Sequence, residues 1–498
     1  MRKGFMRIVE IVIVTMLAFA VLVQFYQIPK QETEWEKLKL SLQANDIILS
    51  LDKKGVDWFN YTEVDKVIIN SISGNMFYNL KIDNVIKNEI NVGCICSVAE
   101  TAGLSNALKY FDLNRQETEF RVSQISPDSI SFSHEYDVIV VFDYNLTENY
   151  TQIRHFLDAG KGIVEFRHFD ISEIDSVQSD FFGLEWNSSL NPNSNPVEFV
   201  SNESYETYYN IYKYFHHIPI FQDNFSSSSG EWSVQTGTWN LQNGNYVGTG
   251  TPAIVTTNAQ FQNYSLRAMF SSQTARNIML IVYWQDISNY GAVGIDMDSD
   301  TVTVFENISG NPINRGSAPS PIPLNYNNWY SMKIISEGNN VDIYINNSYV
   351  ISATLSNIPQ RIGLGVENGQ ASFDNVRVTF SENHIFSNIL QNEKVGPNPN
   401  AKHSKTVLVQ QGTNTPSCII NTNIVNGRGR TAWLASGSGI NQETGNMLKS
   451  LVSWAAGEER YIVKNEVRNA VVAKVYKVYD EDIYQPVEIT LSIGSLYS

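Results

Sequence analysis

Three aspartates form the densest group of acidic side chains whose spacing could hold a metal ion. Asp296, Asp298 and Asp300 alternate along one predicted strand, and alternating residues of a strand point to the same face. Calcium prefers several carboxylate oxygens, so this group is the candidate calcium site. The alternative is a solvated outer face without a metal. No other cofactor is predicted.

Aromatic side chains at predicted loop ends are the candidate sugar-binding residues. Sugars stack on exposed aromatic faces and form hydrogen bonds with nearby polar groups. Trp284, Tyr290 and Tyr326 lie near such loop ends, so we expect them to contact a glycan. The competing interpretation is burial, the commoner position of tryptophan in a β-sandwich. It also applies to Trp232, Trp239 and Trp329.

The three cysteines are Cys94, Cys96 and Cys418, too few for a four-ligand zinc site. Cys94 and Cys96 lie two residues apart on a predicted strand and so point to the same side. One of them could form a disulfide with Cys418 in an exported protein. In the alternative, all three are small buried hydrophobic residues.

No set of residues forms a recognisable catalytic site. His216 and His217 are adjacent, but no acidic residue lies near them at metal-ligand spacing. Arg167-His168-Phe169-Asp170 follows a predicted parallel strand, where α/β folds place their sites, but no nucleophile accompanies it. We therefore predict no catalytic residues and a chain that is not an enzyme.

Charge and the amino terminus predict an exported, membrane-anchored protein. The 51 acidic and 35 basic residues give a net charge of −16, which argues against a nucleic-acid partner. Residues 11–25 carry no charge and, with their neighbours, approach the ~20 residues of a membrane-spanning helix. Arg2, Lys3 and Arg7 precede them, so a single-pass chain should expose its carboxyl-terminal part outside the cell. Asn-x-Ser/Thr sites such as Asn145 fit a glycoprotein.

The pattern along the chain predicts a multidomain fold: an N-terminal transmembrane helix, and an α/β domain interrupted by an all-β sandwich. Apolar runs such as 136–142 are typical of strands buried on both faces and alternate with helical segments. Short strands split by Asn243-Gly244 and Asn368-Gly369 favour tight hairpins in the sandwich. The predicted segments are a signal or anchor at 1–28, a helical stalk at 29–85, the α/β domain at 86–215 and 385–457, the sandwich at 221–380 and a β segment at 458–498.

The start of the chain resembles the class III signal peptide of type IV pilins and their archaeal relatives. In those proteins a short basic leader ends in Lys-Gly and a Phe opens the mature helix, as in Lys3, Gly4 and Phe5. The resemblance implies cleavage after Gly4, pairing of Glu10 with a neighbouring pilin-like subunit, and an archaeal source. The alternative is an uncleaved signal anchor.

The two α/β segments look like the class I glutamine amidotransferase-like fold, a flavodoxin-like α/β domain. The similar stretches are "YDVIVVFDY … FLDAGKGIVEF" and, much later, "GRGRTAWLASGSG … MLKSLVSWAAG". Catalytic members carry a cysteine nucleophile in a Gly-x-Cys-x-Gly elbow after a central strand. Here that strand ends in Phe142-Asp143-Tyr144-Asn145. The resemblance therefore implies a scaffold without this chemistry.

The sandwich looks like a concanavalin A-like jelly roll of the laminin-G-like and 3-keto-disaccharide hydrolase-like kind. The similar stretches include "NNWYSMKIISEGNNVDIYINNSYV" and "IGLGVENGQASFDNVRV". The resemblance implies a sugar-binding module or a glycosidase. Glucanases of this fold carry Glu-x-Asp-x-x-Glu, and that motif is absent from the sandwich.

We therefore predict a membrane-anchored or pilin-like cell-surface protein without catalytic activity, acting in adhesion, glycan binding or filament and envelope structure. The alternative is a membrane-anchored carbohydrate-active enzyme that acts through the jelly roll. The expected partners are the membrane, pilin-like subunits, and a glycan or cell-surface ligand, with no nucleic acid.

Overall fold

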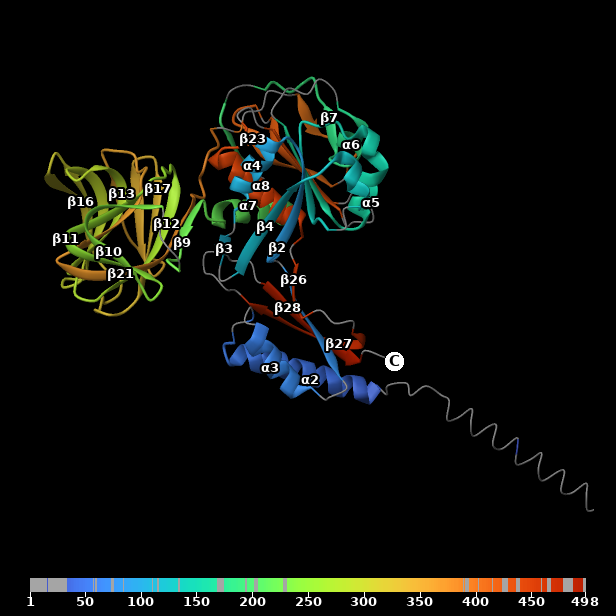
Figure 1. Cartoon of the computed structure of the whole chain (residues 1–498), viewed down its shortest axis with the longest axis horizontal. Coiled ribbons are helices and arrows are strands. Elements are labelled where there is room, and N and C mark those ends of the chain that lie inside the picture. Colours follow the sequence, from blue (N-terminus) through green and yellow to red (C-terminus); the bar gives the residue numbers. More distant parts are fainter. Residues whose placement is uncertain are drawn as a thin grey trace, which may run out of the picture. The chain divides into compact units, whose positions relative to one another are not determined.

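The computed structural model forms two compact units, residues 1–85 with 459–498 and residues 86–458 (Figure 1). Each unit is described by itself. The structure describes residue 16 and residues 34–495, apart from gaps at 57, 59–60, 73–75, 84, 110, 114–115, 133–134, 168–173, 193–194, 201–204, 227–230, 388, 390–393, 402, 414, 423–428, 436–438, 458, 464–466 and 478–486.

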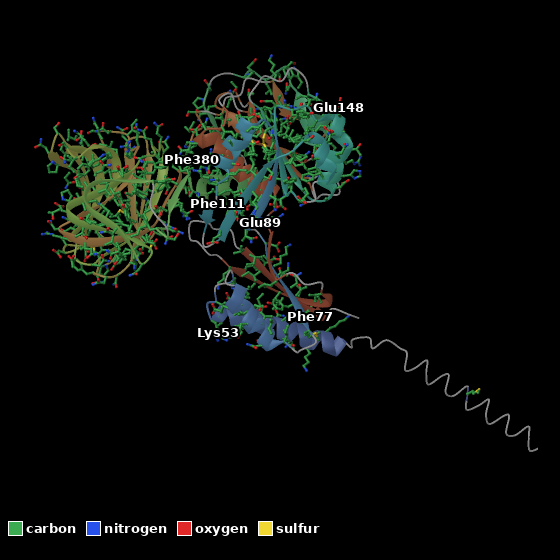
Figure 2. The ribbon with its side chains drawn as sticks, in the orientation of Figure 1. Lys53, Phe77, Glu89, Phe111, Glu148 and Phe380 are labelled. Carbon is green, nitrogen blue, oxygen red and sulfur yellow. A yellow bond between two sulfur atoms is a disulfide. The ribbon has the colours of Figure 1, made fainter. Side chains whose placement is uncertain are left out.

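The first unit packs two helices, α2 (Glu34–Lys53) and α3 (Tyr61–Ser71), on an antiparallel sheet. Its four strands follow the order β26-β1-β28-β27. Ala44, Ile48 and Leu51 recur at helical spacing and are buried with alternate residues of β1 and β28. The predicted stalk and carboxyl-terminal segment thus share one core. The strand bounds are β1 Phe77–Asp83, β26 Glu459–Val463, β27 Arg468–Lys477 and β28 Val487–Ser495. Figure 2 labels Lys53, the last residue of α2, and Phe77, the first residue of β1.

The second unit contains a nine-stranded mixed sheet in the order β3-β4-β2-β5-β6-β25-β24-β23-β8. Strands β4, β2, β5, β6 and β25 are parallel neighbours. The first six strands in chain order are β2 Glu89–Ile95, β3 Phe111–Leu113, β4 Gln116–Gln124, β5 Val138–Phe142, β6 Gly162–Arg167 and β8 Val197–Phe199. The last three are β23 Ser404–Gln410, β24 Pro416–Asn421 and β25 Arg430–Ala435.

Helices and short segments accompany this sheet. Gly162 permits the close approach of helix α8 to β6, because a Cβ there would lie 2.4 Å from the backbone oxygen of Ala455. All five residues of β5 are buried, as expected of a strand covered on both faces. The elements are α4 Val98–Ala107, η1 Pro127–Phe132, η2 Thr147–Asn149, α5 Tyr150–Asp158, α6 Ser176–Asp180, β7 Leu184–Trp186, α7 Tyr205–His217, β22 Val395–Pro397 and α8 Gln442–Ala455.

A β-sandwich lies between β8 and β22 in the chain and is coloured green to orange in Figure 1. Its strands surround one apolar core that includes Trp232, Trp239, Phe270 and Phe373. The first seven strands are β9 Phe221–Asp223, β10 Trp232–Gln242, β11 Asn245–Thr257, β12 Tyr264–Ser272, β13 Asn277–Asp286, β14 Asn289–Asp296 and β15 Thr301–Ile308. The others are β16 Asn311–Pro319, β17 Tyr330–Glu337, β18 Asn340–Ile345, β19 Ser348–Thr354, β20 Gly363–Glu367 and β21 Gly369–Phe380.

The two ends of this sandwich lie side by side. Strand β9 pairs with the end of β21, with Phe221 opposite Val378, and the N–H of Ile220 donates to the carbonyl of Val378 over 2.8 Å. Strands before and after the sandwich in the chain join the same mixed sheet. A chain that leaves and returns at neighbouring points can accommodate such an insertion without distorting its sheet.

The predicted signal or anchor at 1–28, with Gly4, Phe5 and Glu10, lies outside the described residues except for Met16. Within the part of the chain that the structure describes, no helix combines the length and the apolar character that crossing a bilayer requires.

Candidate functional site

Strands β13 and β14 carry apolar residues on both faces, which separates the sandwich core from a second surface. Ile278, Leu280 and Val293 point into the main core. The alternate residues, among them Met279 and Tyr290, form a separate cluster, because successive strand residues point to opposite faces. We call the face that carries this second cluster the outer face.

A row of polar residues crosses one end of the outer face. Strand register places Glu367 opposite Asn277, Asn277 opposite Asp296, and Asp296 opposite Thr301. The Asn277 Nδ2 donates to Glu367 Oε2 over 3.1 Å. We call Glu367, Asn277, Asp296 and Thr301 the polar row. Its two carboxylates sit two strands apart, so their backbones are about 10 Å from each other.

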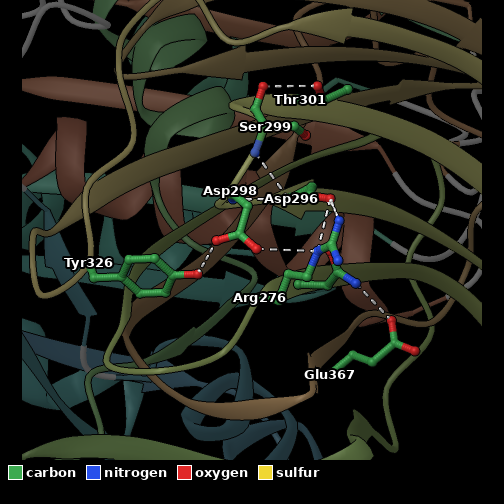
Figure 3. Close-up of polar contacts among 8 residues, drawn as sticks. Arg276, Asp296, Asp298, Ser299, Thr301, Tyr326 and Glu367 are labelled. Carbon is green, nitrogen blue, oxygen red and sulfur yellow. Dashed lines mark hydrogen bonds and ion pairs between the residues drawn. The ribbon is translucent and has the colours of Figure 1, made fainter.

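Arg276 brings a positive charge to the polar row. Its guanidinium donates to Asp296 Oδ2, with Nη2 at 3.1 Å and Nε at 3.3 Å, and lies 3.5 Å from Asp298 Oδ2. The hydroxyl of Tyr326 donates to the other oxygen of Asp298 over 2.8 Å (Figure 3). The hydrogen bond with Asp296 and the charges of both aspartates raise the pKa of Arg276, which therefore stays cationic.

Asp296 is held as a carboxylate by several donors. Burial alone would raise the pKa of Asp296, but hydrogen bonds from Arg276 and from the N–H groups of Asp298 and Ser299 lower it overall. The two N–H groups lie 2.9 Å and 3.2 Å from Asp296 Oδ1. These donors occupy both oxygens, so Asp296 is suited to orienting Arg276 rather than to accepting a substrate proton.

The prediction that three aspartates share one strand face is wrong. Strand β14 ends at Asp296, and the chain then turns. Asp298 faces Arg276, whereas Asp300 has a φ of 51° and its Oδ1 accepts the N–H of Leu324 over 2.9 Å. Among the described residues, no group of three or more acidic, histidine or cysteine side chains is placed to hold a metal ion. Asp300 is thus separated from the other two predicted calcium ligands, and Asp296 and Asp298 both contact Arg276.

An aromatic patch continues the outer face toward the β13–β14 turn. Trp284 and Tyr290 lie opposite each other, with ring centroids 5.6 Å apart, and Tyr290 meets Phe305 at 6.1 Å. Burial raises the pKa of Tyr290, and the negative charge of Glu367 adds to the rise. The patch and the polar row are therefore parts of one surface. We call Trp284, Tyr290 and Phe305 the aromatic patch.

The structure brings the predicted sugar-binding residues to this surface but buries one of them. Tyr290 is 8% exposed and Trp284 is partly buried, because they lie in strands rather than at loop ends. Tyr326 is 37% exposed and belongs to the Arg276 end of the site. Trp232 and Trp239 are buried as predicted, whereas Trp329 is 41% exposed, contrary to the core position predicted for it.

A second carboxylate cluster lies on the inner side of the sandwich. Glu306 is fully buried, accepts the hydroxyl of Tyr283 over 3.0 Å and the N–H of Ser356 over 2.9 Å, and pairs with Arg315. Burial would raise the pKa of Glu306, but these hydrogen bonds lower it overall. This cluster stabilises the fold and does not line the outer face.

Neither alternative for the three cysteines holds in full, because Cys94 and Cys96 are bonded to each other rather than to Cys418. Cys418 is a free, buried cysteine, and burial raises the pKa of its thiol. The reason is distance: β2 and β24 are four places apart in the sheet, which is roughly 19 Å at 4.8 Å per strand. A disulfide needs Cα atoms within about 7 Å.

Polar residues in and after the parallel strands β5 and β6 have the following positions. Asp143, at the end of β5, has a φ of 44°, and His168, Phe169 and Asp170 lie outside the described residues. Glu165 is buried on β6 with Gln178 and Arg167 as donors. Burial raises the pKa of Glu165, and the charge of Arg167 opposes this.

His216 is buried among aromatic rings on α7, in contact with Tyr212 and Phe215. Burial lowers its pKa to about 3, with smaller contributions from His217 and His384. Below the ordinary pKa of 6.5 the unfolded chain binds a proton that the folded chain takes up only near pH 3. Stability should therefore fall as the pH falls through this window, by up to about 1.4 kcal/mol per pH unit.

Urea unfolding between pH 7 and pH 4 tests this expectation. His216→Phe should flatten the pH dependence of the free energy of unfolding. The control is His155→Asn, since His155 is an exposed histidine on α5 that is solvated in both states. Equal slopes for wild type and His216→Phe would contradict the assignment.

Comparison with known proteins finds one family whose profile matches the sandwich. Residues 218–379 match the profile of the 3-keto-alpha-glucoside-1,2-lyase-like domain family. This supports the jelly-roll fold and suggests a glycan-binding or carbohydrate-active role. No curated protein matches the chain. The resemblances of the amino terminus and the α/β domain stay predictions.

Several solved structures are similar to the sandwich. A carbohydrate binding module of Bacillus subtilis is 23% identical over 31% of this chain and 99% of the module, with a TM-score of 0.29. A Bacillus licheniformis beta-glucanase is 13% identical over 32% and 97%, with a TM-score of 0.27. A putative glycosyl hydrolase of Parabacteroides distasonis is 15% identical over 32% and 99%, with a TM-score of 0.26.

The family match contradicts the prediction that the chain is not an enzyme, because the matching family is described as lyase-like. That prediction relied on short local motifs. Glu367 and Asp296 lie far apart in the sequence, and only the register of β20, β13 and β14 places them in one row. The pairing of Asn277 with the Glu367 carboxylate on a neighbouring strand cannot be recognised from a local sequence motif.

Proposed function

We propose that the jelly roll is the catalytic domain of a carbohydrate-active enzyme that cleaves glycosides by elimination. The observation that carries this proposal is the match of residues 218–379 to the 3-keto-alpha-glucoside-1,2-lyase-like family. The polar row and Arg276 supply an arrangement in which such a reaction can be assigned to named residues. The substrate class would be a glycoside whose sugar carries a ketone at C3.

The proposed reaction needs one base and one stabiliser of negative charge. The C3 ketone makes the proton on C2 acidic, and a base removes it. The C1–O bond then breaks, a C1=C2 double bond forms, and the departing oxygen takes a proton and leaves as a hydroxyl. Because the base can return the proton it took, no water, oxidant or reductant is consumed.

Glu367 is the proposed base. It is partly exposed on the outer face, and one oxygen accepts a hydrogen bond from Asn277. This contact fixes the carboxylate plane while the group stays on the surface that a substrate would cover. Asp296 is the weaker candidate because Arg276 and two backbone N–H groups already use its oxygens.

Arg276 is the proposed stabiliser of the enolate that forms when C2 loses its proton. The negative charge develops on the C3 oxygen, and a cation aimed at that atom lowers the barrier. Asp296 and Asp298 orient the guanidinium, and Tyr326 in turn holds Asp298. These three are positioning residues in this proposal.

An assay of the full chain with a 3-keto-disaccharide tests the function. We expect release of one sugar together with an unsaturated product, since a C1=C2 bond conjugated with the C3 ketone absorbs ultraviolet light. Release of two saturated sugars would indicate hydrolysis instead. Binding without any product would contradict the proposed enzyme.

The aromatic patch is the proposed subsite for a more distant sugar. Trp284→Ala should raise KM about tenfold with little change in kcat, because an aromatic contact contributes about 0.5–1.5 kcal/mol beyond its buried area. Trp329→Ala is the matched control, since Trp329 is an exposed tryptophan just before β17 and is not part of the patch. Equal KM values for the two variants would remove the patch from substrate binding.

We also propose that the α/β domain at 86–215 and 385–457 is a flavodoxin-like, amidotransferase-like scaffold interrupted by the sandwich at 221–380. Numbered along the chain, its parallel strands β4, β2, β5, β6 and β25 follow the order 2-1-3-4-5, which flavodoxin-like sheets have.

Residues 1–28 are the proposed membrane anchor, which would hold the enzyme at the outer surface of the cell. Support comes from the uncharged run at 11–25 and the basic residues before it. If the Lys3-Gly4 site is processed as in pilins, the intact mass of the purified protein should correspond to a chain that begins at Phe5. A mass that includes residues 1–4 would leave an uncleaved anchor.

A further inference from the structure

A disulfide between residues only two apart stands at the carboxyl end of β2. Cys94 and Cys96 are bonded, with Cα atoms 5.5 Å apart. Cys94 is fully buried, whereas Cys96 is partly exposed. A disulfide that closes so short a loop removes little entropy from the unfolded chain, and that entropy is the main source of disulfide stabilisation. Stabilising the fold is therefore a weak reason for this bond.

The bond lies where an α/β sheet places its sites. Strands β2 and β5 are neighbours, but the chain runs from β2 outward to β4 and only then returns to β5 on the other side. Ligands of such sheets bind outside the carboxyl ends of the strands at this switch point. Cys94 is level with Val140 of β5, so Cys96 lies level with the last residue of that strand.

The neighbourhood of Cys96 suits a thiolate. Helix α4 begins at Val98, and its N-cap is Ser97, with Glu100 completing a capping box. The amino end of a helix favours negative charge and lowers the pKa of an adjacent thiol, and the Glu100 carboxylate, which accepts the N–H of Ser97, opposes part of this effect. The hydroxyl of Thr101 lies 3.1 Å from Cys96 Sγ and donates to the carbonyl of Ser97 over 2.9 Å, so a change of acceptor would let it donate to a thiolate.

We propose that Cys94–Cys96 is a redox-active disulfide that exchanges with a dithiol partner at the carboxyl end of strand β2 in the α/β domain. A thiolate of the partner attacks Sγ of Cys96, the less buried of the two cysteines, and the Sγ–Sγ bond breaks. Cys94 then carries the thiolate and takes a proton. The second partner thiol attacks the mixed disulfide and releases Cys96. The partner is oxidised by two electrons, and this chain gains two electrons and two protons.

The first experiment uses the wild-type full chain. The folded protein is equilibrated with dithiothreitol, quenched in acid and alkylated, and the alkylated cysteines are identified by mass spectrometry. We expect Cys94 and Cys96 to be reduced together at millimolar dithiothreitol with the circular dichroism spectrum unchanged, and to reoxidise with oxidised glutathione. Reduction that requires denaturant would overturn the proposal and make the bond structural.

The second experiment assigns the attacked sulfur. In Cys94→Ser, the free Cys96 should form a mixed disulfide with oxidised glutathione at least tenfold faster than the buried Cys418 of the same protein. In Cys96→Ser, the buried Cys94 should react no faster than Cys418. A Cys96 that reacts as slowly as Cys418 would overturn the proposal. The wild-type measurement remains decisive if either variant fails to fold.

Discussion

Glu367→Gln should lower the turnover of a 3-keto-disaccharide by about 10²–10⁴-fold, the range that a general base contributes. Glutamine keeps the shape of the side chain and an oxygen that can accept from Asn277 Nδ2, which lies 3.1 Å from the carboxylate. It cannot accept a proton at neutral pH. The loss should therefore appear in kcat with little change in KM, measured by the absorbance of the unsaturated product.

Glu337→Gln is the matched control for this variant. Glu337, at the end of β17, is also partly buried and accepts the amide of Asn383 over 2.8 Å, but it is not in the polar row. Its activity should stay within threefold of wild type. If Glu367→Gln retained wild-type turnover while product was still formed, Glu367 would not be the base, and another group of the outer face would have to take that role.

Local patterns predicted those parts of the fold in which neighbouring residues determine the outcome. Asn243 and Gly244 have φ values of 52° and 77° and close the β10–β11 hairpin between Gln242 and Asn245, as the Asn-Gly pair predicts. The apolar run at 138–142 forms the fully buried strand β5. The type of turn and the burial of a strand are properties of a few consecutive residues.

The same pattern failed where the pairing partner is distant. Asn368-Gly369 links β20 and β21, which do not form a hairpin: β20 lies between β13 and β11, and β21 between β11 and β12. The register shows that the chain does not reverse there, because β20 and then β21 pair with successive stretches of β11, from Thr256 to Ala253 and from Gly250 to Tyr246. Local turn residues cannot specify which distant strand becomes the partner. The pairing of β1 with β26 and β28 is unreadable from the sequence for the same reason.

The candidate site was partly predictable. Trp284, Tyr290, Tyr326, Asp296 and Asp298 all belong to the outer face or its Arg276 end. Their roles were not predictable, because Arg276 converts the two aspartates from possible metal ligands into partners of a guanidinium. Glu367 gave no signal, since its position in the polar row depends on strands β13 and β20 meeting across a long sequence separation.

Glu306→Ala should destabilise the sandwich by about 3–5 kcal/mol, which is typical when one member of a buried ion pair is removed. Glu306 is fully buried, and its oxygens are used by Tyr283, Ser356 and Arg315. Its loss would leave these donors and a partly buried guanidinium without their acceptor. Urea unfolding followed by tryptophan fluorescence measures the change, since Trp232 and Trp239 lie in the sandwich core.

The pH dependence and the activity of this variant separate it from Glu367→Gln. Because the folded-state pKa of Glu306 is lowered, its stabilisation is present above the ordinary carboxyl pKa and is lost as the pH falls through the folded value. Wild type should therefore lose stability in acid by this route, and Glu306→Ala should not.

Below its unfolding temperature Glu306→Ala should keep most of its turnover, because Glu306 faces the interior and not the outer face. A variant that stayed as stable as wild type but lost turnover would move the reacting group from the outer face to the buried cluster of Glu306, Tyr283 and Arg315.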